Sequence, residues 1–174
     1  MELTKVIAKR KSVRAYKPDA VSEETLNAIL AAGCAAPVGM AKYDTLHFTV
    51  IENKEILGRI SNTIKQMMKR EGDAIYAAPT LVIISSKEPM APGIDYTNAA
   101  CIAENMMLTA TDANVGSVLI WGPAMAIEAD SSLKEAIAIP EGYKPLFSVA
   151  FGYPAKDDDK EKELKVKITM NVVK

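Results

Sequence analysis

The sequence predicts an α+β fold in which helices cover a mostly buried sheet. Several segments repeat apolar residues every three to four positions, as amphipathic helices do, and others are short β-branched or alternating blocks typical of strands. These helical and strand segments do not follow one another in the strict order of βαβ units. That order favours an α+β fold over a doubly wound parallel sheet.

In the first third of the chain the pattern predicts three helices and one strand. The first helix is short and ends at Arg10-Lys11, and the second begins after Ser22, an N-cap residue, and stops before Pro37. Residues 46–50 alternate in polarity and predict a strand. Asn53 then caps a third helix that runs to about residue 68.

The rest of the chain predicts four more strands and two helices. Residues 81–84 form a continuous β-branched block, the pattern of a strand covered on both faces. The remaining segments are an Ala-rich buried helix over 95–114, a strand over 117–121, a turn at Gly122-Pro123, a helix over 131–139, a strand over 146–151 and an alternating strand over 166–173. The last strand follows a charged segment, so we expect it to be an edge that pairs with its own sheet or with another subunit.

Composition limits the class of protein. A chain of 174 residues, 49% of them hydrophobic, predicts one domain over 1–174. Its 21 basic and 22 acidic residues give a net charge of −1, which argues against nucleic-acid or membrane partners. We find no signal-peptide or membrane-spanning pattern and no Cys-x-x-Cys spacing, so we expect a cytoplasmic protein with reduced thiols.

Several common chemistries lack their motifs. The nine glycines form no Gly-x-Gly, which excludes a dinucleotide fingerprint and a P-loop. The single histidine, His47, lies in a predicted strand and leaves no basis for a metal site or a Ser-His-Asp triad. Cys34 and Cys101 lie on apolar helix faces and are expected to be small buried residues. We therefore predict neither a catalytic side chain nor a bound metal.

One basic cluster stands out. Arg10-Lys11-Ser12-Val13-Arg14 places three cations and a hydroxyl in five residues. The cluster can be a helix C-terminus whose cations complement the dipole, a solvated charge run, or an anion site. If the segment past Arg10 is extended, Arg10, Ser12 and Arg14 point the same way and suit a phosphate-sized target.

At these residues the sequence resembles the nitroreductase family of flavoproteins, which has a helix, an Arg-basic-Ser-x-Arg/Lys segment and then an aromatic, here Tyr16. The resemblance continues in the same order along nearly the whole chain. It includes Val21 to Leu26, Ala35-Ala36-Pro37, His47 to Ile51, Ala103 to Leu108, Gly116-Ser117 and Phe151 to Pro154.

The resemblance implies a three-layer fold with a central, mostly antiparallel sheet flanked by helices. It also implies a homodimer whose C-terminal segment is exchanged between subunits and whose FMN lies at the interface. In such enzymes NADH or NADPH and a small-molecule electron acceptor use the same flavin face in turn. Arg10, Lys11, Ser12 and Arg14 would hold the phosphate, the ribityl chain and the N1/O2 edge of FMN.

Three further segments are carried over from the family as FMN-binding residues. Backbone groups of Pro37, Val38 and Gly39 would line the flavin, although the chain here lacks the polar side chains usual after Ala-Pro. Trp121-Gly122 falls where backbone N–H groups meet N5 and O4, but Trp121 can equally be a core aromatic at a strand end. Lys165 and Lys167 match a Lys-x-Arg pair at the phosphate, or else are lysines that protect an edge strand.

These observations favour an FMN-dependent NAD(P)H oxidoreductase that reduces nitroaromatics, quinones or similar electron-poor molecules by a ping-pong cycle. An alternative is a flavin-binding or sequestering protein with little turnover. A third is an interaction dimer in which the Arg10 to Arg14 cluster meets carboxylates of a partner.

Overall fold

The computed structural model describes residues 1–89, 91–156 and 158–174 and is built around a four-stranded antiparallel sheet. The strand order is β1-β2-β4-β3. The strands are β1 (Leu46–Ile51), β2 (Thr80–Ser86), β3 (Gly116–Ile120) and β4 (Lys144–Gly152). The neighbouring pairs β1/β2, β2/β4 and β3/β4 are all antiparallel, which confirms the predicted sheet type.

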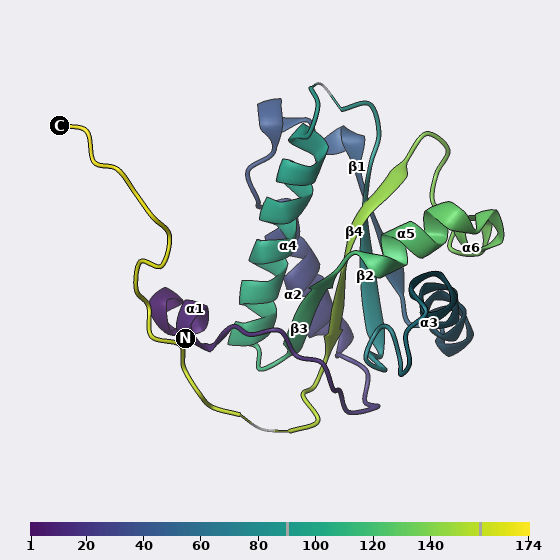
Figure 1. Ribbon diagram of the computed structural model, residues 1–174, viewed down its shortest axis with the longest axis horizontal. Coiled ribbons are helices and arrows are strands. Elements are labelled where there is room, and N and C mark those ends of the chain that lie inside the picture. Colours follow the sequence, from purple (N-terminus) through teal and green to yellow (C-terminus); the bar gives the residue numbers. More distant parts are fainter. Residues whose placement is uncertain (90, 157) are drawn as a thin grey trace.

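Helices cover both faces of this sheet, giving three layers (Figure 1). One face carries α2 (Glu23–Cys34) and α4 (Ile94–Asp112), and the other carries α3 (Lys54–Met68), α5 (Gly122–Ala129) and α6 (Ser131–Ala136). The short N-terminal helix α1 (Leu3–Lys9) lies against α4. Two single-turn 3₁₀ helices, Gly39–Ala41 and Tyr43–Thr45, lead into β1.

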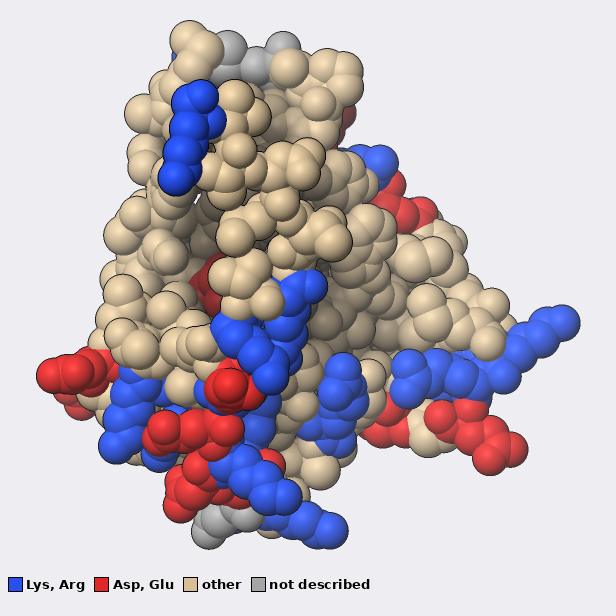
Figure 2. All heavy atoms as spheres, turned by 60° about the vertical axis from the view of Figure 1, so that its left-hand side comes forward, with Lys and Arg blue, Asp and Glu red and all other residues tan. Residues whose placement is uncertain are grey.

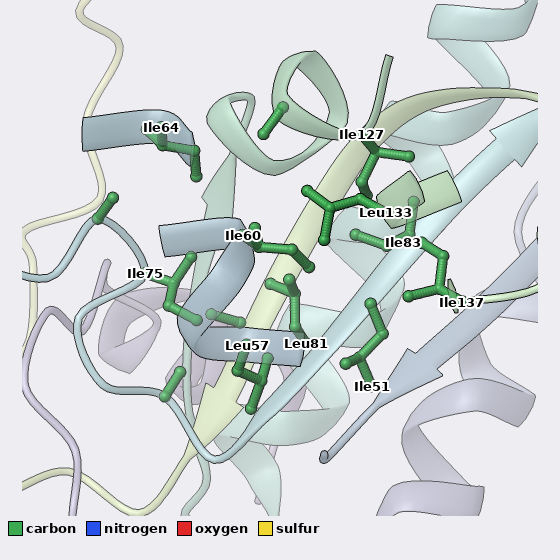
Figure 3. Close-up of a cluster of buried hydrophobic side chains, with 14 of the residues drawn as sticks. Ile51, Leu57, Ile60, Ile64, Ile75, Leu81, Ile83, Ile127, Leu133 and Ile137 are labelled. Atoms are coloured by element: carbon green, nitrogen blue, oxygen red, sulfur yellow. The ribbon is translucent and has the colours of Figure 1, made fainter. Parts of the chain in front are cut away.

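The two hydrophobic cores follow from the period of two in β2. All seven residues of β2 are buried. Leu81 and Ile83 join the core under α3, α5 and α6, which also contains Ile60 and Leu133 (Figure 3). Val82 and Ile84 face the opposite way, into a second core under α2 and α4. A continuous apolar block is needed here because this strand has no solvent face.

The predicted helix starts are confirmed in detail. The Ser22 hydroxyl accepts a hydrogen bond from the Thr25 N–H, and the Asn53 side chain accepts from the N–H groups of Glu55 and Ile56. These bonds satisfy backbone donors that the first turn of a helix leaves without partners.

Three sequence expectations are wrong. Gly122-Pro123 is not a turn but the first turn of α5, where proline fits because that position needs no N–H donor. The segment 166–173 forms no strand within the part of the chain described: it is extended and runs away from the sheet (Figure 1). Cys34, the last residue of α2, is exposed and Cys101 is half-buried, so neither is the fully buried residue expected; both are free thiols.

Candidate functional site

The extended segment after α1 lies beside β3 as a short extra strand. Ser12 forms a parallel bridge with Ser117, and the Val13 N–H donates to the Ser117 carbonyl at 3.0 Å. Gly116 makes this approach possible, since a Cβ there would lie 2.9 to 3.0 Å from the Val13 side chain. The backbone of the basic cluster is therefore fixed to the sheet.

This arrangement gives the cluster two sides. Val13 packs against the core, whereas Ser12 and Arg14 on either side of it are exposed. The period of two predicted for this segment thus holds from residue 12 to residue 14. Arg10, the C-cap of α1, places its Nε 3.7 Å from a carboxylate oxygen of Glu104 on α4.

Lys11 points to a different partner. Its Nζ lies 3.0 Å from a carboxylate oxygen of Asp158 and also contacts the Asp158 carbonyl. The hydrogen bond from Lys11 lowers the pKa of the Asp158 carboxyl below its usual range. Lys9 pairs with Asp159 at 3.5 Å. Lys9 and Lys11 therefore hold the start of the C-terminal segment against the end of α1.

Lys162 is a site residue that the sequence alone did not identify. Its backbone N–H donates to the Ala8 carbonyl at 2.9 Å, which brings the C-terminal segment back across α1. Burial lowers the pKa of the Lys162 ammonium, and the positive charges of Arg10 and Lys167 lower it further, against an opposing effect of Glu104. Lys162 and Lys167 also line one open groove beside Ile7 of α1, and Arg10 pairs with Glu104 just after that helix. We call Arg10, Lys162 and Lys167 the basic group.

The two predicted C-terminal lysines have different surroundings. The positive charge of Lys167 lowers the pKa of Lys162, and Lys167 belongs to the basic group. Lys165 instead pairs with Glu163 at 2.8 Å. Figure 2 shows Lys and Arg gathered over the lower part of this face, interspersed with Asp and Glu. Among the lysines of 156–167, spacing alone gave no signal to prefer Lys162.

The loop after α2 is held by α4. The Gly39 N–H donates to the Asn98 side-chain oxygen at 3.0 Å, and Asn98 is 7% exposed. A Cβ on Gly39 would lie 2.5 Å from Ile94 Cδ1. Met40 and Ala41 follow with φ of 53° and 54°, a left-handed conformation that is uncommon for residues with side chains.

These contacts limit what the loop can offer a ligand. The Val38 carbonyl accepts from the Ala41 N–H at 2.9 Å, the Gly39 N–H is bonded to Asn98, and Pro37 has no N–H. Among the backbone N–H groups of residues 37–39, only that of Val38 has no partner within the described residues. Asn98 therefore fixes the backbone of the loop from α4.

Trp121 lies at the N-cap of α5 and is 54% exposed, so the interpretation as a core aromatic is wrong. Its indole stacks on Tyr96 of α4, with ring centroids 5.9 Å apart and planes inclined by 16°. The following residue, Gly122, is buried, and a Cβ there would lie 3.2 Å from Ile64.

The candidate residues thus form two groups. The first turns of α4 contact both the 37–39 loop, through Ile94 and Asn98, and Trp121, through Tyr96. The basic cluster lies beside Ser117 of β3, four residues before Trp121. At the usual rise per residue of a strand, Ser117 and Trp121 are about 13 Å apart. One end of this surface is cationic, and the other is formed by the loop and aromatic rings.

Comparison with known proteins identifies the family. The sequence model of the Nitroreductase family matches residues 7–153. The chain belongs to this family.

Individual relatives agree with this membership. A protein of Archaeoglobus fulgidus with the provisional name NADH dehydrogenase/NAD(P)H nitroreductase is 32% identical over 91% of this chain and 88% of its own length. A nitroreductase of Bacteroides fragilis with bound FMN is 30% identical with a TM-score of 0.82, and both chains are covered completely. A nitroreductase of Desulfitobacterium hafniense with bound FMN, 24% identical, has the same fold with a TM-score of 0.85 over the full length of both chains.

None of the helices in the described residues is long and apolar enough to cross a membrane.

Proposed function

We propose that this nitroreductase-family protein is a cytoplasmic homodimeric FMN enzyme that oxidises NADH or NADPH. Its acceptors would be nitroaromatics, quinones or similar electron-poor molecules, reduced in a ping-pong cycle. The observation that carries the proposal is the cationic segment from Arg10 to Arg14, which is fixed to β3 and crossed by the backbone of Lys162, in a fold shared with FMN-bound structures.

The charges of the described residues suit a flavin phosphate. Arg10, Lys162 and Lys167 supply N–H donors that form charge-assisted bonds to phosphate oxygens, and such bonds are stronger than neutral ones. Glu104 holds Arg10 with a carboxylate, the same kind of acceptor that a phosphate presents. Ser12 and Arg14 follow Arg10 on the exposed part of the segment that is bridged to Ser117 of β3.

FMN held by these residues would supply the redox chemistry, which is hydride acceptance from NAD(P)H and two-electron, two-proton reduction of the acceptor. The Arg14 guanidinium would stabilise negative charge at the N1/O2 edge. The 37–39 loop and Trp121 would bound the ring and limit access of water. No side chain needs to act as a nucleophile.

The C-terminal segment supports the dimer. Val166, Ile168, Met170 and Val172 are 69% to 84% exposed, and they alternate with polar residues as a strand or strap with one apolar side would. Apolar residues in such a row favour burial against a partner surface. We propose that the C-terminal segment beyond Lys167 is exchanged between subunits and that FMN lies at their interface.

Steady-state NADH and NADPH oxidation with menadione or nitrofurazone tests the activity. The proposal expects turnover that depends on bound FMN and is lost in the Arg14→Ala variant together with FMN retention. FMN retention without turnover would identify the sequestering alternative instead. A wild-type protein that binds no flavin would leave the partner-binding dimer as the better account.

A further inference from the structure

Trp121 is the one tryptophan of the chain, and more than half of its surface is open. Large aromatic side chains are highly buried on average, so an open indole needs a reason. Two more apolar residues near it in sequence, Leu119 at the end of β3 and Met125 on α5, are also exposed. Three exposed apolar side chains therefore lie close together in sequence at the end of β3 and the start of α5.

The orientation of the indole is fixed from behind. It stacks on Tyr96, and Phe147 of β4 packs at an angle to both rings, with centroids 5.1 Å from Trp121 and 5.5 Å from Tyr96. Phe147 itself is buried. Three rings from α4, β4 and the start of α5 thus support one another, and a further ring could stack there with little loss of side-chain freedom.

The backbone next to the indole is also fixed. Gly122, the proposed contact of the flavin ring, is buried against Ile64. The indole is also electron-rich and neutral, so it favours stacking with flat, electron-poor rings over small hydrated ions.

We propose that Trp121, supported by Tyr96, is a specificity-determining residue that selects planar aromatic electron acceptors by stacking. This inference rests on the proposed function and adds a residue that discriminates between acceptors. The acceptor class is that of quinones and nitroarenes whose ring can lie against the exposed indole.

The test compares two acceptors on the FMN-loaded full-length protein. Trp121→Leu keeps an apolar side chain but removes the aromatic plane. We expect its kcat/KM for menadione to fall about two- to tenfold, mainly through KM, because an aromatic pair is worth that much beyond the area it buries. Ferricyanide is an inorganic acceptor that cannot stack, so its kcat/KM should fall less than that of menadione, and the ratio of the two values is the readout.

Two further variants keep the result interpretable. Met125→Leu alters a neighbouring exposed apolar residue that is not part of the ring stack. It should leave kcat/KM unchanged for both acceptors. Trp121→Phe keeps an aromatic plane and should restore most of the menadione preference. Equal losses with menadione and ferricyanide, or no loss with either, would overturn the inference.

A binding measurement needs no turnover. Without NADH or NADPH, menadione should quench the fluorescence of Trp121 saturably in the oxidised, FMN-loaded wild type. If the partner subunit covers the indole, neither menadione nor acrylamide should quench its fluorescence, and the inference would then be wrong. If the protein turns over both acceptors but Trp121 has no role, the inference alone fails; if it retains no FMN, the proposed function fails as well.

Discussion

At the scale of single residues, two lysines three positions apart have different surroundings. Lys162 belongs to the basic group with Arg10, whereas Lys165 is paired with Glu163. Lys162→Gln should therefore weaken FMN binding about five- to tenfold, as loss of one charge-assisted bond to phosphate would. Lys165→Gln should have a much smaller effect.

Fluorescence titration with FMN and with riboflavin separates phosphate contacts from ring contacts. Riboflavin lacks the phosphate, so neither lysine variant should change its dissociation constant. If Lys162→Gln weakens both flavins equally, or Lys165→Gln has the larger effect on FMN, the assignment of Lys162 is wrong.

The same lysine predicts how binding depends on pH. Its pKa is lowered by burial and by the nearby cations, and it must be protonated to attract phosphate. As pH rises, FMN affinity should therefore begin to decrease at a pH lower than the ordinary lysine pKa of about 10.4. Lys162→Arg stays charged and should keep its affinity to higher pH; identical pH profiles for the two proteins would contradict this.

Asn98 offers a second prediction at this scale. Asn98→Leu removes the acceptor of the Gly39 N–H, whereas Asn98→Asp keeps an acceptor oxygen. The leucine variant should lose about 1 to 2 kcal/mol of unfolding free energy and release FMN faster. Asn105→Leu is the control, because Asn105 donates to the Ala32 carbonyl at 3.1 Å elsewhere on α4.

Chemical denaturation and FMN release rates decide the role of Asn98. Asn105→Leu should lower stability with less effect on release. If Asn98→Leu and Asn105→Leu release FMN at the same rate, Asn98 is a structural residue without a positioning role. A wild-type rate of FMN release in Asn98→Asp would support positioning.

Residue roles were predictable where they depend on local periodicity. Exposure of Ser12 and Arg14 around a packed Val13 follows from the period of an extended chain. Asn98 and Lys162 were not predictable, because their partners Gly39 and Ala8 lie far away in sequence. Nothing local distinguishes such residues from other Asn or Lys side chains.

At the scale of elements, the packing of the basic cluster against β3 depends on Gly116. Gly116→Ala would place a methyl group against the β-branched side chain of Val13, which has little freedom to move. We expect a loss of about 1 to 3 kcal/mol in unfolding free energy and weaker FMN binding, since the segment carrying Ser12 and Arg14 must shift.

A double variant tests the cause. Val13→Ala in the Gly116→Ala background should recover part of the FMN affinity, because the smaller side chain removes the clash. Thermal denaturation and flavin titration of the two single variants and the double variant measure this coupling. Strictly additive effects would show that the two residues do not act through their contact.

The C-terminal segment gives a second prediction for an element. Ile168 and Thr169 are adjacent and exposed, and alternate sides of an extended segment face opposite ways. If the apolar side packs on the partner, the Ile168→Glu dimer should dissociate into monomers at a protein concentration at least tenfold higher than the Thr169→Glu dimer does. Light scattering on dilution measures this, and a monomeric wild type would contradict the exchange.

The elements were predicted well where a segment carries its own boundary signal. Ser22 and Asn53 cap helices, and the apolar block of β2 lies at the centre of the sheet. The prediction failed at 166–173, because an alternating pattern specifies an apolar side without specifying what covers it. It also failed at Gly122-Pro123, since this pair suits a turn and the first turn of a helix alike.

At the scale of the whole molecule, membership of the nitroreductase family explains why neither a dinucleotide fingerprint nor a catalytic triad is present. The residues proposed to hold the phosphate and the flavin ring come from opposite ends of β3 and from the C-terminal segment. No single motif could contain them. The functional prediction rested on several short motifs, each weak alone, that occur along the chain in the order typical of the family.

The most direct test of the central claim is a visible absorption spectrum after FMN addition and desalting, recorded for the full-length wild type and for Arg14→Ala. The account predicts an oxidised flavin spectrum with one FMN per chain in the wild type and little bound flavin in the variant. A colourless wild type, or a variant that retains FMN at the wild-type ratio, would contradict it.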